Sequence, residues 1–438
     1  MLKKSPKSLF SEHLSRRSIL QGSLLAGGMA FGGFGSLFGT ANAQEAKKKS
    51  KNVILLFMSG GPSQFETWDP KTGAPTGGPH LNIQTTIPSY RMDEYMPNLA
   101  RLADKMAIIR SMTSELGDHM EAHYFAQTGL PPINVFASPP HWLSVCAQQR
   151  PAEDRLPTYV MLGQQSGGNL ANPGPGFLGP KYQALVCPGG GKGPQDLPQV
   201  IGDADRLKFQ QRNHLRVQLS KTFDQHRQTG PIQQHHQSFA TVNNLLSQNK
   251  LFDITEESAS TLEKYGPSHF GKDCILARRL VENGVPFVRV MHQNGLAWDK
   301  HRRAFENQRY LTTEFDQAAG ALIDDLIDRG LWDSTLVILM GEFGRTPTIQ
   351  GQGPPGRNHW TKSWSMSMGG CGVKPGVVLG ATNKIGTEIT ERPVTIPDLF
   401  STFYTLLGIN PKTELEFEDR PIPLVEDRTA KVIHEVIS

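Results

Sequence analysis

The stretch from Thr335 to Trp360, TLVILMGEFGRTPTIQGQGPPGRNHW, decides how the chain is organised. Its apolar run, residues 336–340, stands between polar residues and Gly341, which is typical of a strand buried on both faces. A loop rich in Gly and Pro follows and carries Glu342 and His359. Ligands of open α/β sheets bind at the carboxyl ends of strands, where loops face the crevice. We therefore expect Glu342 and His359 to take part in the chemistry of the protein.

Each of these residues also has a plainer interpretation. Glu342 could pair with Arg345 across the loop, and His359 could pack on Trp360. Structural ion pairs of this kind are common. The choice depends on whether other strands bring polar side chains to the same edge of the sheet.

A second buried strand is predicted at residues 52–58, NVILLFM. It runs into the loop 59–64, SGGPSQ, at a place that polar ligands or metals could use. The alternative is that Gly60 and Gly61 only form a turn.

A third cluster follows a short strand predicted at 107–110. Asp118 is expected to cap a helix that ends at Gly129. On this helix His119 and His123 lie four residues apart and share one face. That spacing allows two imidazoles to reach one metal ion or anion.

A fourth cluster follows the strand predicted at 286–292. Asp299 and His301 offer a carboxylate and an imidazole close enough to bind one divalent ion, although Asp299 could instead cap the next helix. That helix ends at Gly330 and leads to the strand at 336–340. The alternation of strands and helices predicts an α/β fold with a doubly wound, mostly parallel sheet flanked by helices.

The N-terminal segment predicts export. Arg16 and Arg17 precede a Gly-rich apolar run, 19–38, which ends in the small residues Ala41 to Ala43. This pattern is typical of a twin-arginine signal peptide, 1–43, and the polar stretch 44–51 is read as a linker. A membrane anchor is the weaker alternative because the run contains many glycines. We therefore expect a periplasmic or cell-surface protein with no transmembrane anchor in the mature chain.

The rest of the composition sets further limits. The formal net charge of +4 over 438 residues gives no reason to expect a nucleic-acid partner. Within the domain expected at 52–438, the Pro- and Gly-rich segment of about 131–251 is interpreted as an insertion that caps the sheet. The four cysteines lack the paired spacing of zinc sites, while disulfides between them stay open for an exported protein.

Several of these motifs resemble one protein family. SGGPSQFETWDPK at 59–71, WDKH at 298–301, MGEFGRTP at 340–347 and GRNHW at 356–360 look like the domain of unknown function 1501 family. That family is placed in the alkaline phosphatase and sulfatase superfamily. The resemblance implies the doubly wound fold and metal-dependent hydrolysis of phosphate or sulfate esters, including those of sulfated glycans.

The resemblance also implies roles for individual residues. It points to a divalent metal, Zn, Mn or Ca, and to four metal ligands: Asp299, His301, Glu342 and His359. Counting along the helix places His119 where sulfatases have their nucleophile. For the ester anion we expect Arg345 or Arg357 to supply the positive charge.

Two departures from the superfamily pattern favour a different function. Phe343 stands where a His ligand usually follows the acidic residue, and Ser59 follows the first strand where a metal-binding Asp is usual. The alternative is a catalytically inactive protein that binds a glycan or a protein partner at the cell surface.

Overall fold

A nine-stranded sheet forms the centre of the protein. The computed structural model describes residues 52–132, 138–150, 156–163, 172–194, 249–350 and 353–438, and a few residues between 207 and 218. The predicted signal peptide and linker lie outside these ranges. The strands of the sheet are β1 (Asn52–Phe57), β4 (Met106–Thr113), β5 (Tyr159–Leu162), β6 (Leu185–Cys187), β7 (Phe287–Met291), β8 (Thr335–Met340), β11 (Trp364–Gly369), β12 (Val377–Leu379) and β15 (Val394–Thr395).

The strand order is β12-β4-β11-β8-β1-β7-β5-β6, and β15 pairs with β4. Every pairing is parallel except the two made by β11, which lies antiparallel between β4 and β8. The sequence prediction of a mostly parallel sheet is therefore confirmed. Because eight strands share one direction, their carboxyl ends meet at one edge, where the loops can build a site.

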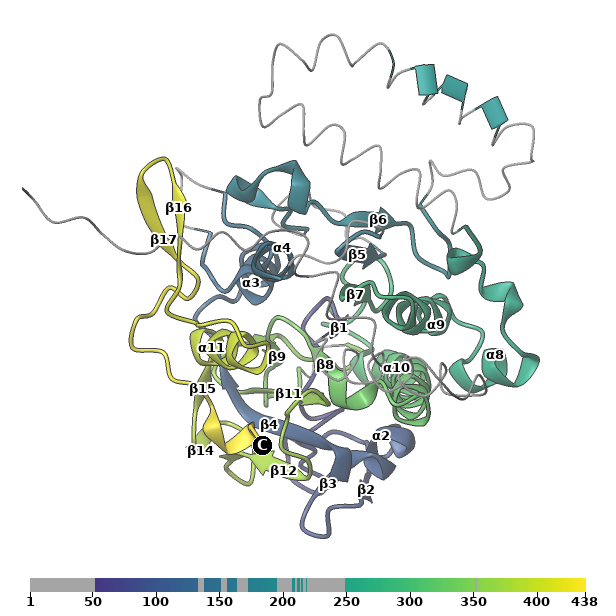
Figure 1. The fold of residues 1–438 in the computed structure, drawn as a ribbon. Coiled ribbons are helices and arrows are strands. Elements are labelled where there is room, and N and C mark those ends of the chain that lie inside the picture. The colour runs from purple at the N-terminus through teal and green to yellow at the C-terminus, as the bar shows by residue number, and fades with distance from the viewer. Residues whose placement is uncertain are drawn as a thin grey trace, which may run out of the picture. The chain divides into compact units, whose positions relative to one another are not determined.

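Helices cover both faces of the sheet (Figure 1). They are α2 (Pro97–Arg101), α3 (His119–Thr128), α4 (Trp142–Gln149), α8 (Ala259–Tyr265), α9 (His269–Glu282), α10 (Ala304–Asp328) and α11 (Ile396–Leu406). In β1, alternate side chains enter two separate cores: Val53, Leu55 and Phe57 pack with α4 and α11, whereas Ile54 and Leu56 pack with α2, α9 and α10. Burial on both faces explains why the strand is continuously apolar.

Among the described residues, four pairs of short strands lie outside the central sheet. They are β2 (Asn82–Gln84) with β3 (Arg91–Asp93), β9 (Gly344–Arg345) with β10 (His359–Trp360), β13 (Ala381–Thr382) with β14 (Ile389–Glu391), and β16 (Glu414–Phe417) with β17 (Arg420–Pro423). The pair β9 and β10 is antiparallel and joins His359 to Arg345. It folds the loop after β8 back on itself, which brings His359 to the edge of the sheet.

Part of the segment expected as an insertion belongs to the sheet instead. β5 pairs in parallel with β7, β6 extends the sheet beyond β5, and α4 packs in the core. These three elements therefore belong to the core rather than to a cap, while the bounds of the insertion stay a prediction. Sequence reading missed these strands because both are short and their surroundings are dense in Gly and Pro. Most of 195–248 lies outside the described residues, and a cap there stays a prediction.

Two other sequence expectations concern membranes and cysteines. Within the described ranges, no helix has both the length and the apolar character needed to cross a bilayer. Cys146, Cys187, Cys274 and Cys371 are all buried thiols, and none forms a disulfide.

Buried carboxylates hold two of the loops. Asp316 of α10 accepts hydrogen bonds from the backbone N–H groups of Asn98 and Leu99 at the start of α2, at 3.0 and 2.8 Å. Asp273 of α9 accepts from the N–H groups of Gly190 and Gly191, at 3.0 and 2.8 Å. Burial raises the pKa of both carboxyls to about 6, and the hydrogen bonds only partly oppose it.

We expect these two groups to make stability depend on pH. Between about pH 4 and pH 6 the folded protein binds their protons more tightly than the unfolded chain, so the free energy of unfolding falls as pH rises. The loss is at most about 3 kcal/mol for each group. Asp316→Asn should remove its share, as measured by urea unfolding at pH 4, 5, 6 and 7. The exposed control Asp333→Asn should keep the parent slope, and an unchanged slope in Asp316→Asn would contradict the assignment.

Candidate metal centre

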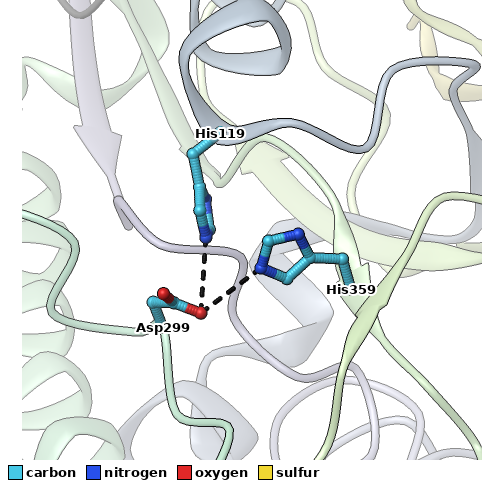
Figure 2. Close-up of side chains that lie close together, drawn as sticks. All are labelled: His119, Asp299 and His359. Carbon is cyan, nitrogen blue, oxygen red and sulfur yellow. Dashed lines mark hydrogen bonds and ion pairs between the residues drawn. The ribbon is translucent and has the colours of Figure 1, made fainter.

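Three side chains from separate loops meet at the carboxyl edge of the sheet (Figure 2). His119 begins α3 after β4, Asp299 lies in the loop after β7, and His359 lies on β10 after β8. One ligand atom from each falls within 4.8 Å of the others, a spacing at which they could hold a metal ion. His301 joins them, since its Nε2 is 2.9 Å from Asp299 Oδ1 and 3.1 Å from His359 Nε2.

Local structure explains why His119 points into the cluster. Asp118 caps α3 by accepting from the N–H groups of Met120 and Glu121, and Gly129 ends the helix in the left-handed conformation. The predicted cap and end of this helix are thus confirmed. The cap fixes the first helical residue, His119, at the edge of the sheet.

The imidazoles of His119, His301 and His359 all turn Nε2 towards the cluster and hold Nδ1 against an oxygen on the other side of the ring. Their Nδ1 atoms each lie 2.8 Å from an oxygen, which is Glu342 Oε1 for His119, Asn358 Oδ1 for His301 and the Gly117 carbonyl for His359. Carboxylate and carbonyl oxygens only accept, so Nδ1 carries the hydrogen in each neutral ring. The lone pair of Nε2 then faces the cluster, as in metal sites where a second group holds the far side of the ligand.

The Nε2 atoms converge on one oxygen. Asp299 Oδ1 lies 3.3, 2.9 and 3.4 Å from Nε2 of His119, His301 and His359. His119 Nε2 is buried and has no hydrogen-bond partner. Lone pairs gathered around a carboxylate oxygen repel one another, whereas a cation between them would satisfy all four groups. The residues present therefore fit a divalent metal ion.

The electrostatics of the cluster favour positive charge. Burial alone would lower the pKa of His119, but its contacts with Asp299 and Glu342 raise that pKa to about 9. Burial alone would raise the pKa of Asp299, yet its contacts with His119, His359 and Arg345 hold that pKa well below its usual range. The field that binds a proton so tightly would also attract a metal cation.

Glu342 lies behind His119 rather than among the converging atoms. Its side chain is fully buried, and Oε1 accepts hydrogen bonds from the Gly60 N–H at 2.9 Å and from His119. Oε2 is 3.6 Å from Nε2 of His123. Glu342 therefore contacts His119 on the side away from the converging atoms and is not itself among them.

The two arginines expected to bind an anion are engaged elsewhere. Arg345 is 1% exposed, and its guanidinium donates to Asp299 Oδ1 at 2.6 Å and to the Gly61 carbonyl at 2.8 Å. Arg357 is also 1% exposed, and it pairs with buried Glu66 at 2.8 Å while donating to three carbonyls. Neither guanidinium faces solvent, so the anion-binding role expected from the sequence does not fit these contacts.

The plainer interpretations of the motifs are also resolved. Arg303, not Asp299, stands at the N-cap of α10. Arg345 pairs with Asp299 and not with Glu342. The His359 ring lies 4.3 Å from the His119 ring and 4.7 Å from Phe343, between centroids, so its neighbours belong to the cluster.

Sequence reading missed the groups that orient the imidazoles. Asn358 could have been found, because it directly precedes His359 in the GRNHW motif. Gly117 could not, because it acts through its backbone carbonyl, which every residue has. Sequence reading also missed the contact between His123 and Ser59. Ser59 follows β1, and its Oγ lies 2.9 Å from His123 Nε2. His119 and His123 therefore share a helix face and both contact Glu342, but the other contact of His119 is Asp299 and that of His123 is Ser59.

Several solved structures are distantly similar to this chain. The lipoteichoic acid synthase LtaP from Listeria monocytogenes is 11% identical, with 86% of this chain and 75% of that chain covered and a TM-score of 0.37. The PsFucS1 sulfatase from Pseudoalteromonas sp. is 12% identical, with 84% and 70% covered and a TM-score of 0.42. The phosphonate monoester hydrolase SpPMH from Silicibacter pomeroyi is 12% identical, with 88% and 76% covered and a TM-score of 0.37. Similarities this weak carry no conclusion about activity.

Sequence comparison is more direct. No curated protein matches the chain. Residues 50–437 match the family described as "Protein of unknown function (DUF1501)". The match spans nearly all of the chain after the predicted signal peptide and linker. The chain therefore belongs to the DUF1501 family.

Proposed function

We propose that the protein is a metal-dependent hydrolase of phosphate or sulfate esters, and that His119, Asp299, His301 and His359 hold the metal. One observation carries the proposal: three imidazoles have Nδ1 tied to an oxygen while their Nε2 atoms converge on one carboxylate oxygen. Structural ion pairs do not need this shared orientation, but metal centres do.

Zinc suits this donor set better than the other metals considered. Three imidazole nitrogens and one carboxylate oxygen match its usual tetrahedral ligands. Calcium takes six to eight oxygens, and manganese also favours carboxylates and water. A zinc ion bound here would polarise an ester oxygen and lower the pKa of a bound water.

The chain's own residues would prepare the site for that chemistry. Glu342 keeps His119 in the correct tautomer, and Arg345 fixes the Asp299 carboxylate. Arg302 and Arg303 are exposed in the loop that carries Asp299 and would draw an anionic ester, such as a sulfated glycan, towards the metal. His119 serves in this account as a ligand rather than as the nucleophile expected from the sequence.

Export is part of the proposal and rests on the sequence. Arg16 and Arg17, the Gly-rich run and the small residues at 41–43 support transport by the twin-arginine pathway to the periplasm or cell surface. That pathway moves folded proteins, which suits a protein whose metal site forms only on folding.

Hydrolysis can be tested with simple aryl esters. Protein stripped with a chelator should be inactive towards p-nitrophenyl phosphate and p-nitrophenyl sulfate, and stoichiometric Zn²⁺ should restore turnover of at least one of them. Mn²⁺ and Ca²⁺ serve as comparisons. Tight binding of one zinc ion with no turnover of either ester, or of a sulfated oligosaccharide, would contradict the hydrolase.

That last outcome would support the second candidate, a protein that binds an anionic ligand without turnover. A specific observation favours it. The guanidinium groups of Arg345 and Arg357 donate their hydrogen bonds to residues inside the protein, so neither is free to stabilise a transferring group. Phe343 also packs against the rings of His119 and His359 where the superfamily pattern has a further ligand. Ligand binding to the zinc form without hydrolysis would establish this alternative.

A further inference from the structure

A second polar cluster lies inside the core that α4 and α11 cover. Its centre is Arg289 of β7, which is fully buried. Its guanidinium donates to Gln127 Oε1 at 2.6 Å, to the Gly163 carbonyl at 3.2 Å and to Asn172 Oδ1 at 3.1 Å. All three partners are neutral, and no carboxylate of the described ranges forms an ion pair with Arg289. A buried charge without a counter-charge is strongly unfavourable.

Four buried polar atoms of this region have no hydrogen-bond partner among the residues that the structure describes. They are Arg289 Nε, His141 Nε2, Ser144 Oγ and Tyr159 Oη. His141 Nδ1 accepts from the Leu143 N–H at 3.0 Å, so the hydrogen of its neutral ring is on Nε2. All four groups can therefore donate a hydrogen bond, and native proteins rarely leave such donors unsatisfied.

The four groups come from neighbouring elements. β5 pairs with β7 so that Met161 lies opposite Arg289, which makes Tyr159 a diagonal neighbour of Arg289 on the same face of the sheet. His141 is the N-cap of α4, and its ring centroid is 5.1 Å from that of Tyr159. Ser144 follows three residues later, in the first turn of α4.

The charge of Arg289 shifts the pKa of both His141 and Tyr159. Burial lowers the pKa of His141 well below its usual value, and Arg289 lowers it further. Burial raises the pKa of Tyr159, while Arg289 opposes that rise. His141 and Tyr159 are therefore neutral donors at neutral pH, and Arg289 supplies the only charge among the four.

We propose that these four donors bind one small monovalent anion of halide size, with chloride as the natural occupant. An anion is the one kind of ligand that accepts from every donor and also neutralises the buried guanidinium. The site is separate from the metal centre and does not depend on hydrolysis.

Bromide can reveal the anion directly. Crystals of the full chain grown in sodium bromide should show an anomalous peak in contact with Arg289 Nε and Tyr159 Oη, when measured at the bromine edge. Crystals grown in chloride should show ordinary density, without the bromine signal, at the same place. A water molecule, or no density, at that position in bromide would overturn the proposal.

The same proposal can be tested in solution, without crystals. At constant ionic strength, replacing sodium gluconate by sodium chloride should raise the melting temperature, because the anion binds only the folded state. Tyr159→Phe and Ser144→Ala each remove one donor and should raise the chloride concentration for half of the effect by about 10-fold, which is one hydrogen bond's worth of affinity. Tyr310→Phe, at an exposed position, should match the parent. Melting that ignores chloride, or donor variants that respond like the parent, would refute the site.

Discussion

His359→Ala should weaken zinc binding by more than about 100-fold and leave the fold intact. Loss of a direct ligand exceeds the 10- to 100-fold effect of losing a group behind a ligand. The His359 side chain is 27% exposed, and its far nitrogen contacts only the Gly117 carbonyl, so little of the core depends on it. Titration with a competing chelator gives the affinity, and circular dichroism checks the fold.

Of the proposed ligands, His359 is the one whose removal should disturb the rest of the fold least. Asp299→Ala would remove the counter-charge of buried Arg345, and His119→Ala would remove one hydrogen bond of buried Glu342, so both would also lose stability. His434→Ala, at an exposed position on the far C-terminal segment, serves as the control and should bind zinc like the parent. Equal zinc affinity in His359→Ala and the parent would remove His359 from the site.

Glu342 should give the second large effect, and a different one. Glu342→Gln keeps the shape but replaces one accepting oxygen with a donor, so the orientation of His119 is no longer fixed. Zinc affinity should fall by about 10- to 100-fold without being abolished. Glu342→Ala should also lower the free energy of unfolding by about 3 to 5 kcal/mol, because the Gly60 N–H and His119 would lose a buried partner.

The two variants separate the two roles considered for Glu342. If it were a direct ligand, Glu342→Gln would lose zinc as completely as His359→Ala. Urea unfolding and zinc titration of both variants, with exposed Glu388→Gln as the control, decide between the roles. A parent-like affinity in Glu342→Gln would show that it neither binds zinc nor orients His119.

The long buried strands were predictable from the sequence. β1 and β8 are continuous apolar runs because both faces are covered, and β7 follows the same pattern in spite of Arg289. The cap and end of α3 were also predictable, since Asp118 and Gly129 act on their immediate neighbours. β5 and β6 were not, because strands of four and three residues give too little periodicity.

The candidate site was predictable in its members more than in their roles. Parallel strands bring their carboxyl ends together, so Asp299, His301 and His359 were expected to meet, and their side chains do lie together. The roles of Glu342, Arg345 and Arg357 depend on which buried partner lies within hydrogen-bond distance. Two of those partners, Gly60 for Glu342 and Glu66 for Arg357, lie more than 280 residues away in the chain, where no local pattern can reveal them.

The most direct test is an anomalous difference map at the zinc edge from crystals of the zinc-loaded protein. We expect one strong peak bonded to Nε2 of His119, His301 and His359 and to an oxygen of Asp299, at distances of about 2.0 to 2.2 Å. Glu342 should remain outside the coordination sphere, hydrogen-bonded to His119. A map with no peak between these side chains, from crystals soaked in stoichiometric or higher zinc, would contradict the metal centre and with it the proposed hydrolase.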